Sequence, residues 1–188
     1  MNNSQKILTL MDLAMKQNPH PFARLVKGKP VAKGREAVAG LIEKGKEPAS
    51  PKSLLIQSAL YLCFDCFDEA HNIAQDHDGL IGNWLHAILH RREPDAGNSK
   101  YWYARIKISP KISQGIGGEA LKILRAHPSK ELESFQKKLS KSGEWAPEAF
   151  VDLCDKIRQE DSALPAYQAL AQIQDVEWQG LVANILAP

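Results

Sequence analysis

The residues with the clearest chemical potential share one predicted helix, where His86, His90 and Glu93 are spaced at i, i+4 and i+7. This spacing places two imidazoles and a carboxylate on the same helical face. Two histidines one turn apart can bind a single metal ion, and His71 on the preceding helix could add a further nitrogen. Zinc, manganese or iron suits such mixed nitrogen and oxygen ligands. The sequence therefore offers a candidate metal site made of His71, His86, His90 and Glu93, although the HExxH pattern of metalloproteases is absent.

A metal-free polar pocket is the second interpretation of the same region. Imidazole titrates near neutral pH, so any of the three histidines could act as a general base, with a nearby carboxylate to orient it. The candidate ligand-binding residues are Tyr61, Asp65, His71, His86, His90, Glu93 and Tyr101. They identify neither a ligand nor a reaction, and they leave open whether the protein is an enzyme.

A purely structural interpretation is also open. The helix predicted over residues 51–64 is apolar on most sides but carries a polar strip that includes Tyr61 and Asp65. Unpaired buried polar groups cost roughly 1–3 kcal/mol each, so this strip needs partners. In this interpretation His86 and His90 hydrogen-bond to Tyr61 and Asp65 and order the core. Histidines that converge on one accessible point would favour a ligand site instead.

Cations and aromatic rings alternate just after the histidines, in a form that could bind phosphate or stack on a planar ligand. The alternative is that the rings pack in the core while the cations face water or pair with Glu93 and Asp95. We favour this alternative from the sequence. The residues concerned are Arg91, Arg92, Lys100, Tyr101, Trp102, Tyr103 and Arg105.

Two shorter motifs carry less weight. Cys63 and Cys66 form a CxxC pair, but they fall at the end of a predicted buried helix, where the helix dipole does not activate a thiol. We interpret them as small core hydrophobes. Residues 115–120 match GxGxxA formally, yet no preceding strand or βαβ unit accompanies them, so a dinucleotide site is not expected.

Hydrophobic periodicity, caps and prolines predict an all-α protein, with no convincing period-two strand. We expect one domain over residues 1–188 with about nine helices, arranged around a buried central helix at 51–65. Residues 106–118 are predicted to form the longest irregular connection. The expected helices cover residues 4–17, 31–44, 51–64, 67–75, 81 or 83 to 92, 95–105, 118–126, 129–141, 147–159 and 165–186.

The composition limits the partners. The 188 residues carry a net charge of +2, and lysine and arginine are scattered rather than concentrated, so no nucleic-acid partner is expected. No stretch approaches the roughly 20 apolar residues of a membrane span, and we expect no membrane partner. Three cysteines and the absence of a signal-peptide pattern favour a reduced, cytoplasmic setting.

The run HAILHRREPDAGNSKYWYARI, with FDEAHNIAQD before it, resembles an uncharacterised family of helical proteins with the signature HAILHRREPDxxNxKYW. This resemblance covers residues 54–105 closely and implies an all-helical fold without implying a reaction. The segment FDEAHNIAQ also resembles part of a tetratricopeptide-like hairpin, which predicts two stacked helical hairpins. A non-catalytic protein-interaction module is therefore the alternative to a small-molecule or ion-binding protein, and the oligomeric state is open.

Overall fold

The computed structural model describes residues 22–43 and 50–187, with side chains described from residue 50 onward and for residues 22–40. Within these ranges the chain is helical and contains no strand, which confirms the all-α prediction. The helix expected over residues 4–17 lies outside them. The helices are α2 (Ala32–Glu43), α3 (Pro51–Cys63), α4 (Phe67–Ala74), α5 (Leu80–Arg92), α6 (Ala96–Tyr103), α7 (Pro110–Ala126), α8 (Glu133–Ser142), α9 (Pro147–Ile157) and α10 (Pro165–Leu186), with a 3₁₀ turn at Lys130–Leu132.

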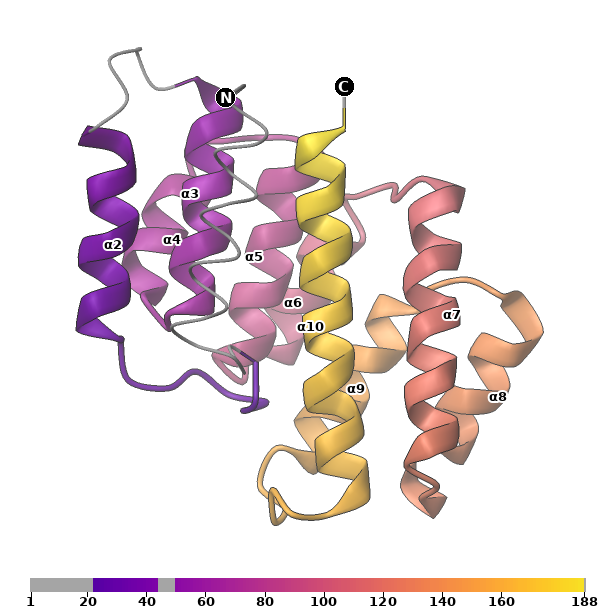
Figure 1. The fold of residues 1–188 in the computed structure, drawn as a ribbon. Coiled ribbons are helices and arrows are strands. Elements are labelled where there is room, and N and C mark those ends of the chain that lie inside the picture. The colour runs from indigo at the N-terminus through magenta and orange to yellow at the C-terminus, as the bar shows by residue number, and fades with distance from the viewer. Residues whose placement is uncertain (1–21, 44–49, 188) are drawn as a thin grey trace.

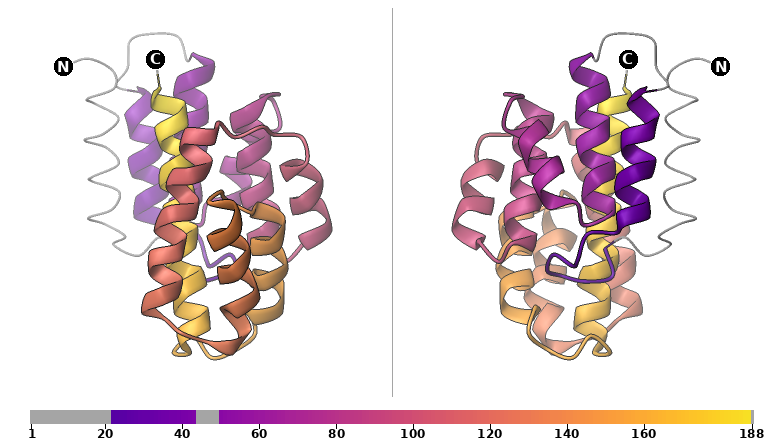
Figure 2. Two further views of the ribbon diagram at one scale, coloured as in Figure 1. Left: turned by 90° about the vertical axis from the view of Figure 1, so that its right-hand side faces the viewer. Right: turned by 90° about the vertical axis from the view of Figure 1, so that its left-hand side faces the viewer.

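Two groups of helices are joined by the last helix. α2 to α6 lie on one side of the molecule, α7 to α9 lie on the other, and α10 runs between them (Figure 1). The side views show α10 between α3 and α7 (Figure 2). α10 is buried along most of its length, and its Trp178 indole donates a 3.0 Å hydrogen bond to the Ala59 carbonyl of α3. α10 thus connects the two groups through one apolar core.

Two antiparallel hairpins, α3–α4 and α5–α6, pack against each other through α4 and α5. A buried serine closes each hairpin. Ser58 Oγ donates to the Ala70 carbonyl at 2.8 Å, and Ser99 Oγ donates to the Ala87 carbonyl at 2.7 Å. Because Ala70 precedes His71 and Ala87 follows His86, each serine anchors one histidine-bearing helix to the other helix of its own hairpin.

The helix starts follow local sequence signals. Ser50 caps α3 by accepting from the Ser53 amide at 3.2 Å, and Asp95 caps α6 by accepting from the Asn98 amide at 3.0 Å. Pro147 and Pro165 occupy the first turns of α9 and α10, where proline loses no hydrogen bond. These starts agree with the sequence prediction.

One connection was predicted wrongly. Residues 110–118 are helical, because α7 begins at Pro110 rather than at Gly118. The glycines in this stretch argue against a helix locally. However, Gly117 allows α7 to pack directly on the backbone of residues 144–145, since an added Cβ would lie 2.9 Å from the Glu144 carbonyl carbon. Tertiary packing therefore overrides the local preference.

Adjacent glycines of α7 supply a matched pair of substitutions. Gly118→Ala should stabilise the protein by roughly 0.5–1 kcal/mol, because alanine favours helix and nothing lies within 4 Å of the new Cβ. Gly117→Ala should destabilise it by about 1–3 kcal/mol, because its Cβ meets the backbone of residues 144–145. Urea unfolding of both variants checks this, and equal effects of the two changes would contradict the packing argument.

The CxxC pair lies inside the core. Cys63 and Cys66 are both buried and form no disulfide. Burial raises the pKa of each thiol, which disfavours the thiolate needed for redox or metal chemistry. Their environment fits thiols that serve as small hydrophobes.

No helix in the described part of the chain has the length and apolar character needed to cross a membrane.

Candidate functional site

Three histidines meet where α4, α5 and α6 pack together. His71 comes from α4, while His86 and His90 lie one turn apart on α5. The ring centroids of His71 lie 5.0 Å from His86 and 5.8 Å from His90, and those of His86 and His90 are 6.0 Å apart. Trp102 of α6 stacks on His86 with centroids 4.3 Å apart and planes 13° from parallel. We refer to His71, His86, His90 and Trp102 as the histidine face.

His86 is the most deeply placed of the three, with 4% of its surface exposed. Its Nδ1 is buried and has no hydrogen-bond partner. The Gly82 carbonyl one turn earlier favours the protonated ring but forms no hydrogen bond of normal geometry with Nδ1. Burial, reinforced by His71 and His90, lowers the pKa of His86 to about 4. His86 is therefore neutral across the physiological range.

The behaviour of His86 differs from that of two other helical histidines. His77 Nδ1 lies 2.8 Å from the Ile73 carbonyl, and His127 Nδ1 lies 3.0 Å from the Ile123 carbonyl. Both rings thus satisfy Nδ1 with the carbonyl one turn earlier. His86 stacks on Trp102, and its Nδ1 forms no hydrogen bond of normal geometry with the Gly82 carbonyl.

His90 has partners at both ring nitrogens. Its Nε2 lies 3.2 Å from Asn98 Nδ2, which assigns Nε2 as the acceptor if the amide donates. Its Nδ1 lies 3.5 Å from Glu93 Oε2, and Glu93 also accepts from Lys27 Nζ at 3.0 Å. Burial lowers the pKa of His90, while Glu93 opposes the shift. His90 is held in place by its neighbours rather than free to bind.

Tyr61 and Asp65, which the sequence grouped with the histidines, lie in other surroundings. The Tyr61 hydroxyl pairs with Gln57 at 3.4 Å, and burial raises its pKa. Asp65 pairs with Arg92 at 2.8 Å. Neither His86 nor His90 hydrogen-bonds to them, so the polar strip does not satisfy the histidines as the structural interpretation required.

Tyr101 lies at the edge of the histidine face. It is 49% exposed, and its ring meets Trp102 edge to face at 5.3 Å. The Arg105 guanidinium lies over the Tyr101 ring, 3.2 Å from its centroid. This exposed pair borders the face without entering it.

Arg91 and Arg92 are not at the surface, which corrects the expectation that they face water or pair with Glu93 and Asp95. Both are buried, at 3% and 0% exposure. Arg92 donates to Asp65 and lies over the Phe22 and Phe67 rings at 4.9 and 5.2 Å. Burial lowers the pKa of Arg92, and Asp65 partly offsets this. The consecutive arginines point to different sides of α5.

Arg91 forms a closed network with Glu177, Tyr103 and Trp84. It donates to Glu177 Oε2 at 2.6 Å and to the Tyr103 hydroxyl at 2.7 Å. The Tyr103 hydroxyl donates to Glu177 Oε1, which also accepts from Trp84 Nε1 at 3.2 Å. Burial alone would lower the pKa of Arg91, but the Glu177 carboxylate outweighs it and raises that pKa. This network joins α5, α6 and α10 and is closed to solvent, so we assign it to the fold.

Sequence reasoning missed Glu177, although one signal was present. Glu177 lies four residues after Ile173 and four before Leu181, on the apolar face of α10. A lone carboxylate on a buried helical face requires a buried cation as partner. The sequence does not say which cation.

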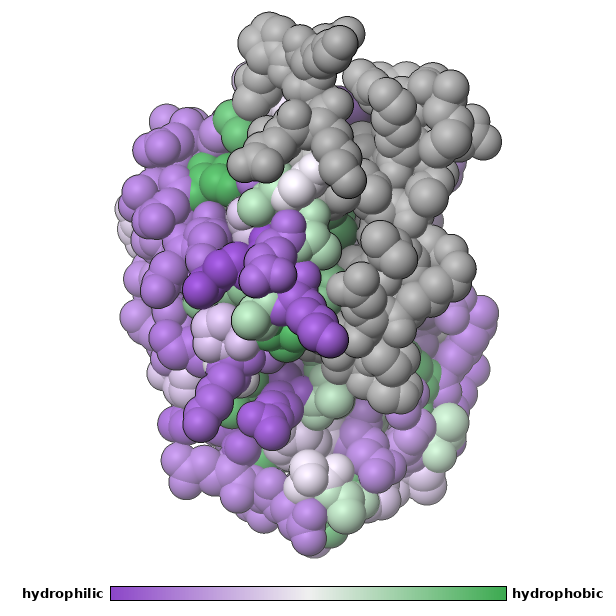
Figure 3. All heavy atoms as spheres, turned by 60° about the vertical axis from the view of Figure 1, so that its left-hand side comes forward, coloured by the Kyte–Doolittle hydropathy of each residue, from purple (hydrophilic) through white to green (hydrophobic). Residues whose placement is uncertain are grey.

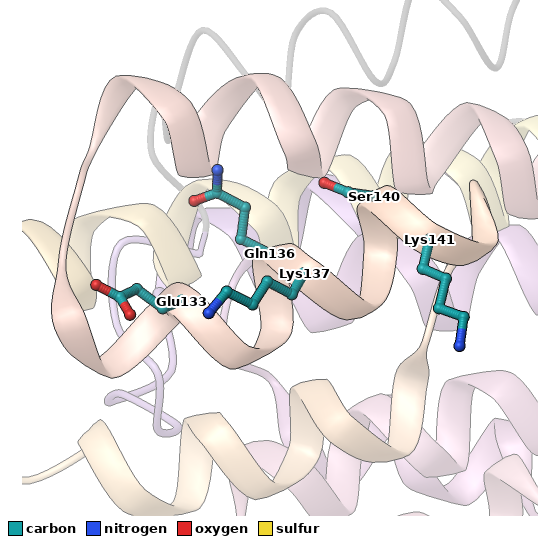
Figure 4. Close-up of a pocket in the computed structure, with 5 residues that line it drawn as sticks. All are labelled: Glu133, Gln136, Lys137, Ser140 and Lys141. Atoms are coloured by element: carbon teal, nitrogen blue, oxygen red, sulfur yellow. The ribbon is translucent and has the colours of Figure 1, made fainter.

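A separate hollow lies on the far side of the fold. It has a volume of about 410 Å³ and is lined by residues of α8 alone: Glu133, Gln136, Lys137, Ser140 and Lys141 (Figure 4). In the figure the Lys137 side chain runs along α8 toward Glu133, whereas the Lys141 side chain points away from the helix. No buried polar group lines this hollow, so it offers little for selective binding.

The donor atoms of the histidine face do not form a ready metal site. Among the residues that the structure describes, no group of three or more His, Cys, Asp or Glu side chains has the arrangement needed to hold a metal ion. Both nitrogens of His90 already have neighbours. A metal ligand set of His71, His86, His90 and Glu93 would therefore require side chains to move.

Comparisons with known proteins add no relative. No protein-family model matches the chain, and no curated protein or solved structure matches it either.

Proposed function

We propose that this protein binds a small polar ligand at the histidine face. The observation that carries the proposal is the buried His86 Nδ1, which forms no hydrogen bond of normal geometry although the Gly82 carbonyl lies one turn earlier. Leaving a buried polar group unpaired costs about 1–3 kcal/mol, and a ligand that accepts a hydrogen bond removes this cost. His77 and His127, by contrast, each bond Nδ1 to the carbonyl one turn earlier.

The surroundings of His86 support a binding role. His71, His90 and Trp102 are all partly exposed, so a ligand can reach the face from solvent. A flat aromatic wall and neutral imidazoles provide shape and polar contacts without a strong fixed charge. Whether a reaction follows binding depends on the ligand, and His86, with its pKa lowered to about 4, is a weak base near neutral pH.

The alternative, a non-catalytic interaction module, rests on the α3–α4 and α5–α6 hairpins. On the face drawn in Figure 3, hydrophilic side chains predominate among the described residues. Protein-interaction sites more often show a contiguous apolar patch. The exposed large hydrophobic side chains of the described residues, Val31, Tyr101 and Leu164, are far apart in the sequence, and this favours a small ligand over a protein partner.

Native mass spectrometry tests the proposal. Protein purified without chelators should carry an additional mass that is lost on denaturation. His86→Phe should abolish this mass, because it preserves the ring but removes both nitrogens. Circular dichroism should show unchanged helix content in the variant.

The matched control is His127→Phe, a histidine on the other side of the fold that bonds only to Ile123 and Gln172. This variant should retain the ligand. The proposal fails if no ligand mass is found and if zinc, manganese and iron salts, small carboxylates and phosphate all leave the melting temperature unchanged.

A further inference from the structure

A second buried donor lies beside His86. Trp102 Nε1 is buried without a hydrogen-bond partner. The Trp102 and His86 rings stack at a centroid distance of 4.3 Å, so their unpaired nitrogens belong to neighbouring, nearly parallel rings. An indole nitrogen can only donate, which means that its missing partner must be an acceptor.

We infer that the group recognised at the histidine face is an oxyanion, either a carboxylate or a phosphate, that accepts hydrogen bonds from Trp102 Nε1 and His86 Nδ1. This inference rests on the proposed function and names its ligand class. Charge-assisted hydrogen bonds to an anion are about twice as strong as neutral ones, so they offset the burial of both donors.

The neighbouring charges agree with an anionic ligand. The guanidinium carbon of Arg105 lies 6.0 Å from the Trp102 ring centroid, and its Nη1 donates to the Tyr101 carbonyl at 2.9 Å. No carboxylate among the described residues forms an ion pair with Arg105, so its positive charge can attract an anion to this edge of α6. Glu93, which contacts His90, is already engaged by Lys27 and His90.

A metal ion would satisfy the site less well. It would bind imidazole nitrogens but leave the Trp102 N–H without an acceptor. It would also have to displace Asn98 or Glu93 from His90. An oxyanion satisfies both unpaired nitrogens and leaves His90 in place.

Nuclear magnetic resonance of the indole N–H groups tests the inference. The four tryptophans give separate reporters, and the signal missing in Trp102→Phe assigns that residue. Sodium acetate, sodium benzoate and inorganic phosphate are titrated at constant ionic strength. A saturable shift of the Trp102 signal by at least one of these probes is expected. A response to acetate or benzoate indicates a carboxylate ligand, and a response to phosphate indicates a phosphate ligand.

Two variants test whether the Trp102 indole donates to the bound probe. Trp102→Phe keeps an aromatic ring against His86 but removes the donor, and should weaken binding of the active probe about tenfold or more, read from the His86 ring signals. Trp145→Phe is the control, since Trp145 Nε1 is also buried without a partner but lies in a separate aromatic cluster with Phe135 and Phe150. It should leave the affinity unchanged.

Two outcomes overturn the inference. Absent or unsaturable shifts at Trp102 with all three probes exclude an oxyanion. Full binding by Trp102→Phe excludes the indole as a donor. If native mass spectrometry still shows a ligand that His86→Phe loses, the proposed function stands and only the oxyanion assignment fails.

Discussion

Replacing Glu177 with glutamine should lower the free energy of unfolding by about 3–5 kcal/mol, because the change leaves the Arg91 charge buried without a counter-charge. The side chains of Arg91 and Glu177 are only 1% and 0% exposed, so water cannot solvate the remaining charge. Glutamine has nearly the same shape as glutamate, which separates loss of charge from loss of packing. Urea unfolding monitored by circular dichroism measures the effect.

An exposed ion pair provides the control for this experiment. Lys100 and Asp152 are 2.8 Å apart, but their side chains are 39% and 63% exposed. Asp152→Asn should cause no measurable loss of stability, because solvent screens such pairs. Similar losses in both variants would contradict the assignment of the Arg91 network to the buried core.

A double variant tests the same network in the opposite direction. Combining Arg91→Met with Glu177→Gln removes both charges and keeps an amide oxygen that accepts from Trp84 and Tyr103. Buried ion pairs can be replaced in this way with little loss of stability. The double variant should therefore be more stable than Glu177→Gln.

Acidification from pH 6.5 to 4 should reduce the free energy of unfolding by about 3 kcal/mol through His86 alone. The pKa of His86 is lowered from its usual 6.5 to about 4 in the folded protein. Below pH 6.5 the unfolded chain therefore binds a proton that the folded chain excludes. Stability falls as the pH decreases through this window, and the penalty becomes constant about one pH unit below the folded pKa of about 4.

The groups facing His86 explain the direction of this effect. His71 and His90 add positive charge when they are protonated, and Trp102 covers one side of the ring. Only the Gly82 carbonyl favours the protonated form. The lowered pKa of His90 acts in the same direction over the same range.

The His86→Phe variant isolates this contribution. Carboxylates titrate in both proteins, so their effects cancel in the difference between the two stability profiles. In cationic buffers free of carboxylate and phosphate, the wild type should lose more stability than the variant between pH 6.5 and 4. Parallel profiles would show that His86 is not protected from protonation.

Local sequence signals determined most of the helices. Serine, aspartate and proline at helix starts, together with apolar periodicity, located α3, α6, α9 and α10 within a few residues. These signals act through the backbone hydrogen bonds of the first turn and do not depend on distant residues. The start of α7 was missed because Gly117 is explained only by its contact with residues 144–145.

The candidate site also has features that the sequence predicts and features that depend on tertiary packing. The i, i+4 spacing of His86 and His90 placed them on one face of α5, because helical geometry alone decides this. The approach of His71 and the stacking of Trp102 depend on how the α3–α4 and α5–α6 hairpins pack together. The sequence also grouped Tyr61 and Asp65 with the histidines, but their hydrogen-bond partners in the structure are Gln57 and Arg92, which the sequence could not indicate because it does not specify which way neighbouring helices rotate.

Only the tertiary structure decided the position of the consecutive arginines. Side chains at adjacent positions of a helix point about 100° apart, so Arg91 and Arg92 face different neighbours. Arg91 finds its carboxylate 86 residues away in Glu177, and Arg92 finds Asp65 on α3. Local sequence thus determined the helices and the placement of His86 and His90 on one face, whereas long-range packing decided which charges are buried and which buried nitrogens lack a hydrogen-bond partner.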